Sequence, residues 1–405
     1  MPGPLAGVKV VDLTTVYSGP YCTLLLGDLG ADVVKVEAPE GDVVRRIGPG
    51  RTSAMGPLFL SVGRNKRDLC LDLKAPGARP VLDRLVDWAD VVVHNMRPRA
   101  AARLGVDPSS VLARNPRAIH CSLVGFGSGG PYADLPAYDD VIQAASGFVA
   151  VQSAGSVRPE YARSVIADKV AGLAAFGAVC AALYRRQQTG TGEAVEVPMF
   201  ETFTSFVALE HLYGLSFVPP TGPATYPRVM SPERRPFRTA DGWLSVVLYN
   251  DRHWRGFFEL VGRPELADDP RYADHGARTV HTDELYAMVD EAMAGRTTAE
   301  WLADLRALEV PAMEVRAIEE LPSDPHLRAV GLFARLVHPS EGEYVQIANP
   351  LRFSAGIDEH RLHPPRLGEH TVEVLCDLGF EAAEVDELVN GGVARVAPAG
   401  TPEPA

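Results

Sequence analysis

Short apolar strands alternate with helices along the first 127 residues, and this alternation restricts the fold more than any other feature of the chain. Residues 8–13 (VKVVDL) form the first apolar run, and residues 18–31 are predicted to form a helix that ends at Gly30. Further strands are expected over residues 31–37, 89–95 and 118–127, and a further helix over residues 79–88. Strands that alternate with helices in this way favour an α/β fold with a large doubly wound domain and a mostly parallel sheet.

Residues 164–186 place one carboxylate, Asp168, at the start of a predicted helix made largely of small residues. The larger apolar side chains of this segment recur at helical spacing, with Ala and Gly between them, so the helix can pack closely on several sides. Arg185 and Arg186 suit a helix C-terminus, and the sequence TGTG ends the helix. An Asp at this place is a cap for the first free amides, a nucleophile that the helix dipole keeps ionised, or both.

The composition is that of a globular chain. Its 405 residues are 46% hydrophobic and 22% charged, which is enough for two domains or one elaborate domain. The first residues do not resemble a signal peptide, and we find no apolar run of about 18 residues. We therefore expect a cytoplasmic protein with no membrane partner. The five cysteines are scattered without CxxC spacing, which indicates small core residues and not a disulfide framework or a metal site.

Charge and glycine spacing argue against two classes of ligand. The formal net charge of −13 disfavours nucleic acid as a partner, and an anionic substrate would need a local basic patch. Residues 125–131 (GFGSGGP) follow a predicted strand, as the turn of a dinucleotide-binding site does. They are followed by YADLPAYDD and not by an apolar helix, which disfavours a nucleotide-binding Rossmann site.

We expect the second half of the chain to contain a smaller α+β domain that is joined to the large one. We expect residues 1–214 to form the first part of the large domain, and the proline- and glycine-rich residues 215–234 to cross between domains. The small domain is expected over residues 235–325. Residues 395–405 are predicted to be a disordered tail.

Five segments carry a family resemblance that covers nearly the whole chain. They are VYSGPYCTLLLGDLGADVVKVE (16–37), NKRDLCLDLK (65–74), GFGSGGPYADLPAYDDVIQAASG (125–147), the ADKVAG around Asp168, and PRLGEHTVEVLCDLGF (365–380). With these motifs in this order, the chain resembles the class III CoA-transferases, a family that also contains α-methylacyl-CoA racemases. The resemblance implies CoA chemistry, a return of residues 326–394 to the large domain, and a homodimer of two interlocked chains.

The resemblance further implies that Asp168 is the catalytic nucleophile. Attack on an acyl-CoA would give a mixed anhydride, return of the thiolate would give an enzyme thioester, and a free acid would then take the CoA. Such an exchange uses acyl-CoA as a substrate and needs neither a metal nor a permanently bound cofactor. The family's CoA contacts correspond by position to Val16, Tyr17, Leu71, Lys74, Asn95, Met96, Arg103 and Leu104. Lys74 and Arg103 would meet phosphates, and the alternative for both is a solvated surface face.

The residues Tyr138 and Asp139 distinguish the branches of the family. The racemases carry a His where this chain has Tyr138, whereas the formyl-CoA-type transferases carry a Tyr–acid pair that Tyr138–Asp139 resembles. A phenol has an unperturbed pKa near 10 and is a poor base for an α-proton at neutral pH. Transfer is therefore favoured over racemisation or epimerisation, and a non-catalytic CoA-binding protein is the third possibility. The alternative for Tyr138 is an aromatic residue packed at a turn.

The chain departs from the formyl-CoA-type enzymes at several places, which disfavours oxalate or formate as its acid. Tyr17 stands where they carry Gln, Ala38 stands where they carry Arg, and their tetraglycine loop has no counterpart before residues 235–243. We expect a small carboxylic acid as the substrate, with a dicarboxylic acid as one candidate. Three arginines could bind a distal carboxylate or form a plain surface patch: Arg45, Arg46 and Arg51.

Overall fold

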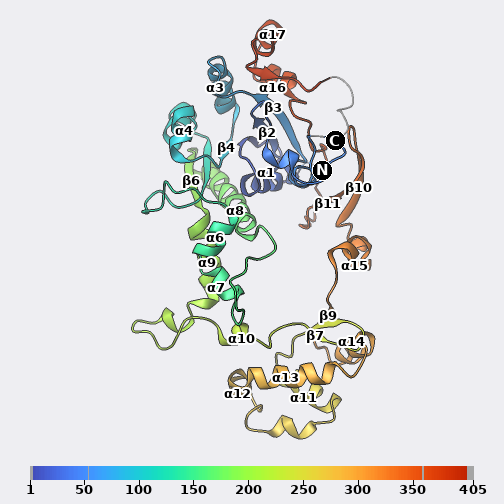
Figure 1. Ribbon diagram of the computed structural model, residues 1–405. Coiled ribbons are helices and arrows are strands. Elements are labelled where there is room, and N and C mark those ends of the chain that lie inside the picture. The colour runs from blue at the N-terminus through green and yellow to red at the C-terminus, as the bar shows by residue number, and fades with distance from the viewer. Residues whose placement is uncertain (1–2, 53, 358–359, 399–405) are drawn as a thin grey trace. The chain divides into compact units, whose positions relative to one another are not determined.

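The computed structural model describes residues 3–52, 54–357 and 360–398. The chain forms two compact units, coloured along the chain in Figure 1. The first unit contains the residues up to Gly147, residues 162–206, and the residues from His326 onward. The second unit contains residues 148–161 and 207–325. The predicted small domain, 235–325, lies within the second unit, and residues 148–161 group with it although they belong to the expected large-domain segment.

A seven-stranded sheet is the centre of the first unit. Its strand order is β12-β3-β2-β1-β4-β5-β6, and all neighbours are parallel except β12, which pairs antiparallel with β3. The strands are β1 (Lys9–Leu13), β2 (Asp32–Glu37), β3 (Lys66–Leu71), β4 (Val91–His94), β5 (Ile119–Val124), β6 (Glu193–Pro198) and β12 (Ala394–Arg395). The predicted α/β class with a mostly parallel sheet is confirmed.

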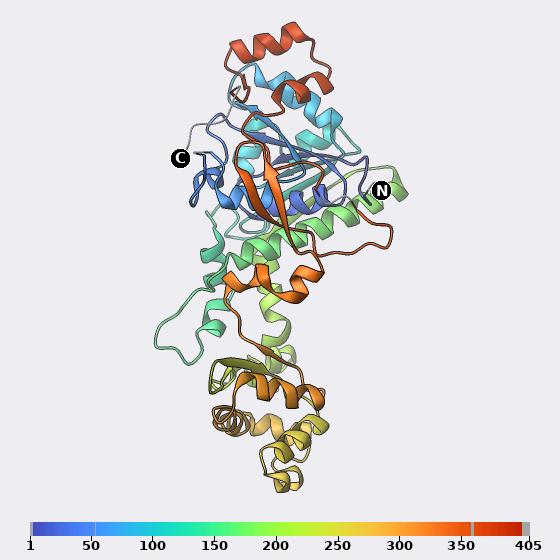
Figure 2. The ribbon, with the colours of Figure 1, turned by 90° about the vertical axis from the view of Figure 1, so that its right-hand side faces the viewer.

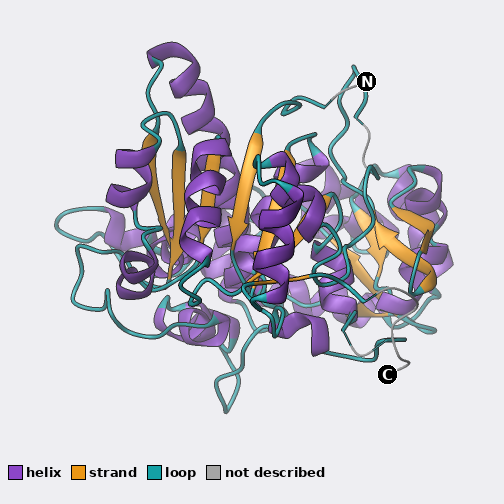
Figure 3. Ribbon diagram, turned by 90° about the horizontal axis from the view of Figure 1, so that it is seen from above, coloured by secondary structure: helices purple, strands orange, loops and turns teal. Residues whose placement is uncertain are grey.

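Helices cover both faces of this sheet (Figure 3), because successive side chains of each strand point to opposite faces. Val10 packs with Leu26 and Val179 on one face, whereas its neighbour Val11 packs with Leu85 on the other. The helices of the unit include α1 (Ser18–Asp28), α2 (Pro57–Val62), α3 (Ala78–Trp88), α4 (Pro98–Leu104), α5 (Pro108–Arg114), α6 (Asp139–Ala145), α8 (Ile166–Thr189), α16 (Thr371–Asp377) and α17 (Ala382–Asn390). Helix α15 (Pro325–Ala329) also belongs to it, except for its first residue, which falls in the second unit. A 3-10 turn, η1, spans Val43–Arg46.

The small residues of α8 let it lie directly against α1. A Cβ added at Gly172 would meet the carbonyl oxygen of Ser18 at 2.6 Å, so no larger residue fits there. The helix ends at Gly190, whose φ of 79° is left-handed, as the TGTG sequence predicts. The close packing at Gly172 brings the first turns of α1 and α8 together.

Helix α8 is long and apolar enough to cross a membrane by length and composition alone. The expectation that no apolar run of about 18 residues occurs is wrong here, because the alanines and the larger apolar residues of α8 give an 18-residue window a mean hydropathy of 1.7. The helix packs against α1, β5 and β6, and a core helix of this kind meets the same criterion. One face of α8 remains exposed and carries Leu173 and Tyr184.

The C-terminal part of the chain adds a hairpin and two helices to the first unit. Strands β10 (Phe333–His338) and β11 (Gly342–Ile347) form an antiparallel pair, drawn in orange in Figure 2. After α16 and α17, strand β12 pairs Ala394 with Leu71 and Arg395 with Cys70. Arg395, where we expect the tail to begin, is therefore a strand residue, and residues 399–405 lie outside the described part of the chain.

The second unit has an aromatic core beside a three-stranded antiparallel sheet. The strands are β7 (Phe237–Arg238), β8 (Trp243–Val246) and β9 (Ala312–Glu314). Phe257, Phe258 and Trp301 are almost fully buried in this core. Its helices are α7 (Phe148–Gln152), α10 (Pro227–Met230), α11 (Asp251–Leu260), α12 (His275–Val280), α13 (Thr282–Met293) and α14 (Thr298–Ala307), with 3-10 turns η2 (Tyr213–Ser216), η3 (Pro264–Asp268) and η4 (Ile318–Ser323). Helix α9 (Met199–His211) spans the boundary between the units.

Candidate active site

A pocket opens at the carboxyl ends of β1, β4 and β5. The strand order reverses at β1, because β2 lies on one side of β1 and β4 on the other, and ligands of open α/β sheets bind outside such a reversal. The pocket has a volume of about 200 Å³. It is lined by Thr15, Val16, Ser18, Asn95, Met96, Arg97, Pro98, Leu123, Val124, Gly125, Ala133, Leu135, Pro136, Ala137, Tyr138, Asp168 and Met199.

Asp168 lies in the first turn of α8 and lines this pocket. The helix begins at Ile166, and Val165 is its N-cap residue, so Asp168 is not the cap that one interpretation of the sequence suggests. The pKa of Asp168 is raised to about 6, first by burial and then by the charge of Asp139, while a hydrogen bond with Ser18 lowers it. The helix dipole favours the ionised carboxylate and would lower this pKa, but burial and the charge of Asp139 have the larger effect. The carboxyl group is still mostly ionised at pH 7.

Asp139 is the first residue of α6 and is buried. Its Oδ1 accepts a hydrogen bond of 2.9 Å from the backbone N–H of Asp168, and its Oδ2 accepts one from the amide of Gln143. The same amide nitrogen donates to the carbonyl of Ser164 at 3.2 Å, and the Gln143 oxygen accepts from the N–H of Ala162 at 3.0 Å. Asp139 therefore ties the start of α8 to α6, and it lies behind the lining of the pocket.

Two tyrosines lie near Asp168. Tyr138 lines the pocket and is 71% exposed. It is therefore accessible to a ligand, and it is not the aromatic residue packed at a turn that one interpretation of the sequence suggests. Burial raises the pKa of the Tyr17 phenol, and the charge of Asp168 raises it further, so Tyr17 is protonated at neutral pH. Tyr17 also packs against Tyr21, with the ring centroids 6.4 Å apart.

The structure brings together part of the expected CoA contacts. Val16, Asn95 and Met96 line the pocket with Asp168. Asn95 and Met96 also line an adjoining pocket of about 560 Å³, which contains Arg103. In the described part of the chain, the linings of these two pockets do not include Tyr17, Leu71, Lys74 or Leu104. Leu71 is fully buried, Leu104 packs on the same apolar cluster, and Lys74 is exposed just after β3.

Sequence reasoning missed five polar residues that line these pockets: Thr15, Ser18, Arg97, Arg99 and Asp134. Arg97 lines both pockets, and Arg99 lines the adjoining one with Arg103. The sequence HNMRPRA places both arginines directly after Asn95 and Met96, which was a usable signal. Ser18 had no such signal, since its partner Asp168 lies 150 residues further along the chain.

Two backbone amides of the glycine-rich turn after β5 are bonded to carboxylates. The N–H of Gly127 donates to Glu201 at 2.9 Å, and the N–H of Ser128 donates to Glu196 at 3.0 Å. Carboxylates at these amides would repel a pyrophosphate. This arrangement agrees with the prediction that the turn is not a nucleotide-binding fingerprint.

The three arginines suggested as an anion site differ in their surroundings, and Arg45 is not available to an anion. Arg45 is buried and pairs with Glu37 at 2.7 Å and Asp68 at 3.3 Å. Arg46 donates to the carbonyl of residue 40, and Arg51 donates to the carbonyl of residue 341. The proposal that Arg45 binds a distal carboxylate is wrong, because its guanidinium group is buried and already paired with Glu37 and Asp68.

Comparison with known proteins places the chain in a family. Residues 5–371 match the family model described as CoA-transferase family III. The chain is 33% identical over 385 residues to the succinate–glutarate CoA-transferase of Agrobacterium fabrum, covering 93% of this chain and 96% of that protein. It is 33% identical over 411 residues to the formyl-CoA:oxalate CoA-transferase of Streptomyces avermitilis, covering 96% and 99%.

A solved structure shows the same fold. The crystal structure of a CAIB/BAIF family protein from Brucella suis matches with a TM-score of 0.79 and 30% identity, covering 93% of this chain and 100% of that one. The family model and the two relatives each span nearly the whole chain, so the match includes the pocket residues. The resemblance stated from sequence motifs is thereby confirmed. The chain belongs to CoA-transferase family III.

Proposed function

We propose that the protein transfers CoA from a short acyl-CoA to a small carboxylic acid, with Asp168 as the nucleophile. The observation that carries this proposal is the place of Asp168 in the pocket outside the carboxyl ends of β1 and β4, beside a second pocket lined by arginines. A carboxyl group with a pKa of about 6 is mostly ionised at neutral pH, as a nucleophile must be. Membership of CoA-transferase family III supports the same chemistry.

The proposed reaction exchanges one thioester for another. The Asp168 carboxylate attacks the thioester carbonyl, the C–S bond breaks, and a mixed anhydride and the CoA thiolate form. The thiolate attacks the Asp168 carbonyl carbon and releases the donor acid as its carboxylate. The acceptor carboxylate then attacks the aspartyl-CoA thioester, whose C–S bond breaks to give a second mixed anhydride and the CoA thiolate. The thiolate attacks the acceptor's acyl carbon, the acyl C–O bond of the anhydride breaks, and the new acyl-CoA and the Asp168 carboxylate are released. Charges balance at each step, and the cycle needs no external oxidant or reductant.

Tyr138 and Asp139 take different roles in this proposal. Tyr138 is accessible and lines the pocket, so it contacts the acyl group or the incoming acid. Asp139 is buried and bonded to the backbone of Asp168, so it positions the nucleophile and adjusts its pKa. The acid of the Tyr138–Asp139 pair therefore acts through Asp168.

The adjoining pocket suits the nucleotide part of CoA. Arg97, Arg99 and Arg103 bring three guanidinium groups to it, with one acidic residue, Asp134, among the lining. Arg99 pairs with Asp134 at 3.2 Å, and both side chains are largely exposed, so this pair contributes little and can open for a phosphate. Guanidinium groups bind phosphates in bidentate fashion. In a chain of net charge −13, this patch is the local basic surface that an anionic substrate needs.

The size of the first pocket favours a short acyl group. Its volume of about 200 Å³ lies below the range of roughly 300–1,000 Å³ typical of sites for drug-sized ligands. Two relatives are named for succinate and glutarate or for formyl-CoA and oxalate, and these names support a small dicarboxylic acid as one substrate. Arg97 lines both pockets, so in this proposal it is within reach of a second carboxylate in the first pocket as well as of a CoA phosphate in the adjoining one.

We also propose a homodimer, in line with the interlocked chains that the family resemblance implies. Each unit exposes large apolar side chains that water disfavours. Leu173 and Tyr184 on α8 are 49% and 70% exposed, and Leu209, Phe217 and Val218 are 83%, 59% and 99% exposed. Burial of these side chains between two chains would stabilise the association.

Covalent trapping tests the proposed nucleophile. Incubation with acyl-CoA alone, followed by hydroxylamine, should convert the Asp168 carboxyl into a hydroxamate. Trypsin would release residues 164–169 (SVIADK), in which Asp168 is the single acidic side chain, so mass spectrometry assigns the modification without ambiguity. The matched control is Asp168→Asn, which should give no modified peptide. An unmodified SVIADK peptide from an active enzyme would contradict the proposal.

A further inference from the structure

Val16 holds a backbone conformation that β-branched residues rarely adopt. Its φ is +69°, in the left-handed region, where the Cβ of an L-residue crowds the backbone. Residues in such conformations persist only where the surrounding structure holds them, and they gather at functional sites. Val16 lines the same pocket as Asp168.

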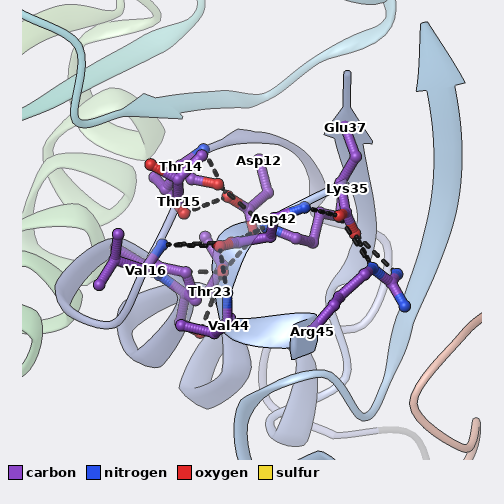
Figure 4. Close-up of polar contacts among 12 residues, drawn as sticks. Asp12, Thr14, Thr15, Val16, Thr23, Lys35, Glu37, Asp42, Val44 and Arg45 are labelled. Atoms are coloured by element: carbon purple, nitrogen blue, oxygen red, sulfur yellow. Dashed lines mark hydrogen bonds and ion pairs between the residues drawn. The ribbon is translucent and has the colours of Figure 1, made fainter. Parts of the chain in front are cut away.

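Asp42 holds the backbone of Val16 directly (Figure 4). Both carboxylate oxygens of Asp42 accept a hydrogen bond from the N–H of Val16, each at 3.2 Å. The same carboxylate accepts from the N–H of Val44 at 3.2 Å and from the ammonium group of Lys35 at 3.3 Å. In Figure 4 the nitrogen of Val16 faces Asp42, whereas the side chain of Val16 points away.

Asp42 is itself fixed by buried charges. Its backbone N–H donates to Glu37 at 2.6 Å, and Glu37 in turn pairs with Arg45 at 2.7 Å. The ammonium group of Lys35 also donates to the carbonyl of Thr14 at 2.9 Å. Asp42 is 3% exposed, so these bonds are shielded from water. Asp42 is therefore a rigid support against which the segment after β1 is held.

The segment after β1 leads directly to the proposed nucleophile. Val16 lies two residues before Ser18, whose side chain hydrogen-bonds Asp168. On the other side of Val16, Asn95 binds both backbone groups of Thr15, at 3.0 Å to its N–H and 2.8 Å to its carbonyl. Val16 therefore lies between Thr15, which Asn95 binds, and Ser18, which bonds Asp168. A change of φ at Val16 would rotate these two residues relative to each other and disturb both contacts.

We propose that Asp42 is a positioning residue for CoA binding: by holding Val16 in the left-handed conformation, it sets residues 15–18 as one wall of the pocket. The identity of the ligand rests on the proposed function. A role in fold stability alone would not depend on the residue at position 16. Positioning does depend on it, because glycine adopts the left-handed conformation without steric cost.

Calorimetric titration of CoA into the full chain tests this proposal apart from turnover, so a failure of the proposed reaction leaves the test intact. Asp42→Asn keeps the shape of the side chain but offers one acceptor oxygen to Val16, Val44 and Lys35. We expect CoA to bind at least about tenfold more weakly. In a Val16→Gly background, the same Asp42→Asn change should weaken binding by less than about threefold, since the two effects are coupled.

Asp28→Asn is the matched control. Asp28 is buried and pairs with Arg64 at 2.5 Å, so its loss also removes a buried charge. It lies at the far end of α1, about 15 Å along the helix from Ser18. We expect a fall in Tm similar to that of Asp42→Asn, with CoA affinity within about twofold of the original. An equal loss of CoA affinity in Asp28→Asn, or an equal effect of Asp42→Asn in both backgrounds, would overturn the proposal.

A second pair of variants tests the conformation with Asp42 intact, in case Asp42→Asn does not fold. Val16→Gly and Val16→Ala differ by one methyl group, and only the alanine retains a Cβ that disfavours positive φ. We expect the glycine variant to bind CoA about fivefold more tightly than the alanine variant. Equal affinities would show that the left-handed conformation at this position does not matter for binding.

Discussion

The backbone N–H of Asp168 donates a hydrogen bond of 2.9 Å to Oδ1 of Asp139, so a buried acid holds the acid that lies in the pocket. The charge of Asp139 also repels that of Asp168, and after burial it is the second cause that raises the pKa of Asp168 to about 6. One residue thereby affects both the place and the protonation of the proposed nucleophile.

This relationship predicts the pH dependence of the reaction. A carboxyl group with a raised pKa is protonated below that pKa and cannot attack, so kcat/KM should fall about tenfold per pH unit below pH 6. Asp139→Asn removes the charge but keeps an acceptor oxygen, and should shift this acid limb to lower pH. Burial, the larger cause, remains, so the shift will be partial. The measurement is kcat/KM against pH for both proteins.

The control for this experiment is Asp140→Asn, which changes the exposed neighbour of Asp139 and should leave the acid limb in place. The raised pKa of Asp168 also makes the free energy of unfolding depend on pH. The folded chain binds the proton of Asp168 more tightly than the unfolded chain, so this contribution is present below about pH 3.8 and is lost as pH rises through about 6. An acid limb that is identical in Asp139→Asn and the original enzyme would contradict the coupling.

Asp168→Asn should abolish transfer while leaving the fold and CoA binding intact. The amide keeps the shape of the side chain but is no nucleophile, and loss of a catalytic nucleophile lowers kcat by at least about a thousandfold. Steady-state assays with calorimetric CoA titration on the same sample would separate the two effects. Retention of most of the activity would show that Asp168 is not the nucleophile.

The arginines of the adjoining pocket should act on the nucleotide part of the substrate. Arg103→Gln should raise KM for acyl-CoA about tenfold and leave KM for the corresponding acyl-pantetheine unchanged, because the latter lacks the nucleotide phosphates. Arg185→Gln is the matched control, since Arg185 is an exposed arginine that pairs with Glu193 at 2.8 Å near the far end of α8. A rise in KM for both substrates would place Arg103 at the acyl end instead.

Lys74→Gln provides a separate test of the family resemblance. The resemblance assigns Lys74 to a CoA phosphate, whereas neither the pocket of Asp168 nor the adjoining pocket is lined by it. A rise in KM for acyl-CoA equal to that of Arg103→Gln would extend the binding surface beyond these pockets. A change of less than about twofold would restrict the phosphate contacts to the arginines.

Solvent deuterium should distinguish transfer from racemisation. A racemase must exchange the α-hydrogen of a 2-methylacyl-CoA, because its reaction passes through an enolate. Among the described residues that line the pocket there is no histidine to act as the base for an α-proton. We therefore expect no deuterium at Cα after turnover in deuterated water. Incorporation at the rate of turnover, with Asp168 unmodified, would assign the protein to the racemase branch.

A dimer should have twice the 43.6-kDa mass of one chain in light scattering. If the chains are interlocked, tagged and untagged dimers should not exchange subunits without unfolding. Mixing the two and capturing the tag would detect exchange. A monomeric mass, or mixed dimers within minutes, would contradict the proposed assembly.

Several features of this protein follow from local sequence pattern. The apolar runs around Val10 and Val11 predict strands buried on both faces, because neighbouring side chains of a strand must point to opposite sides. The alternation of strands and helices predicts the parallel sheet. Small residues and a terminal Gly190 predict the long helix that carries Asp168, and the motifs around it identify the family. All these signals depend on residues close together in the chain.

What the sequence by itself determined was thus the fold class, the family and the acid at the start of α8. Only the tertiary structure decided which charges remain available for a ligand. Arg45 is buried and paired with Glu37 and Asp68 from neighbouring strands, whereas Arg97 and Arg103 line the pockets beside Asp168. A buried charge must find its partner wherever the fold brings one, and the strands, not the local sequence, set those distances.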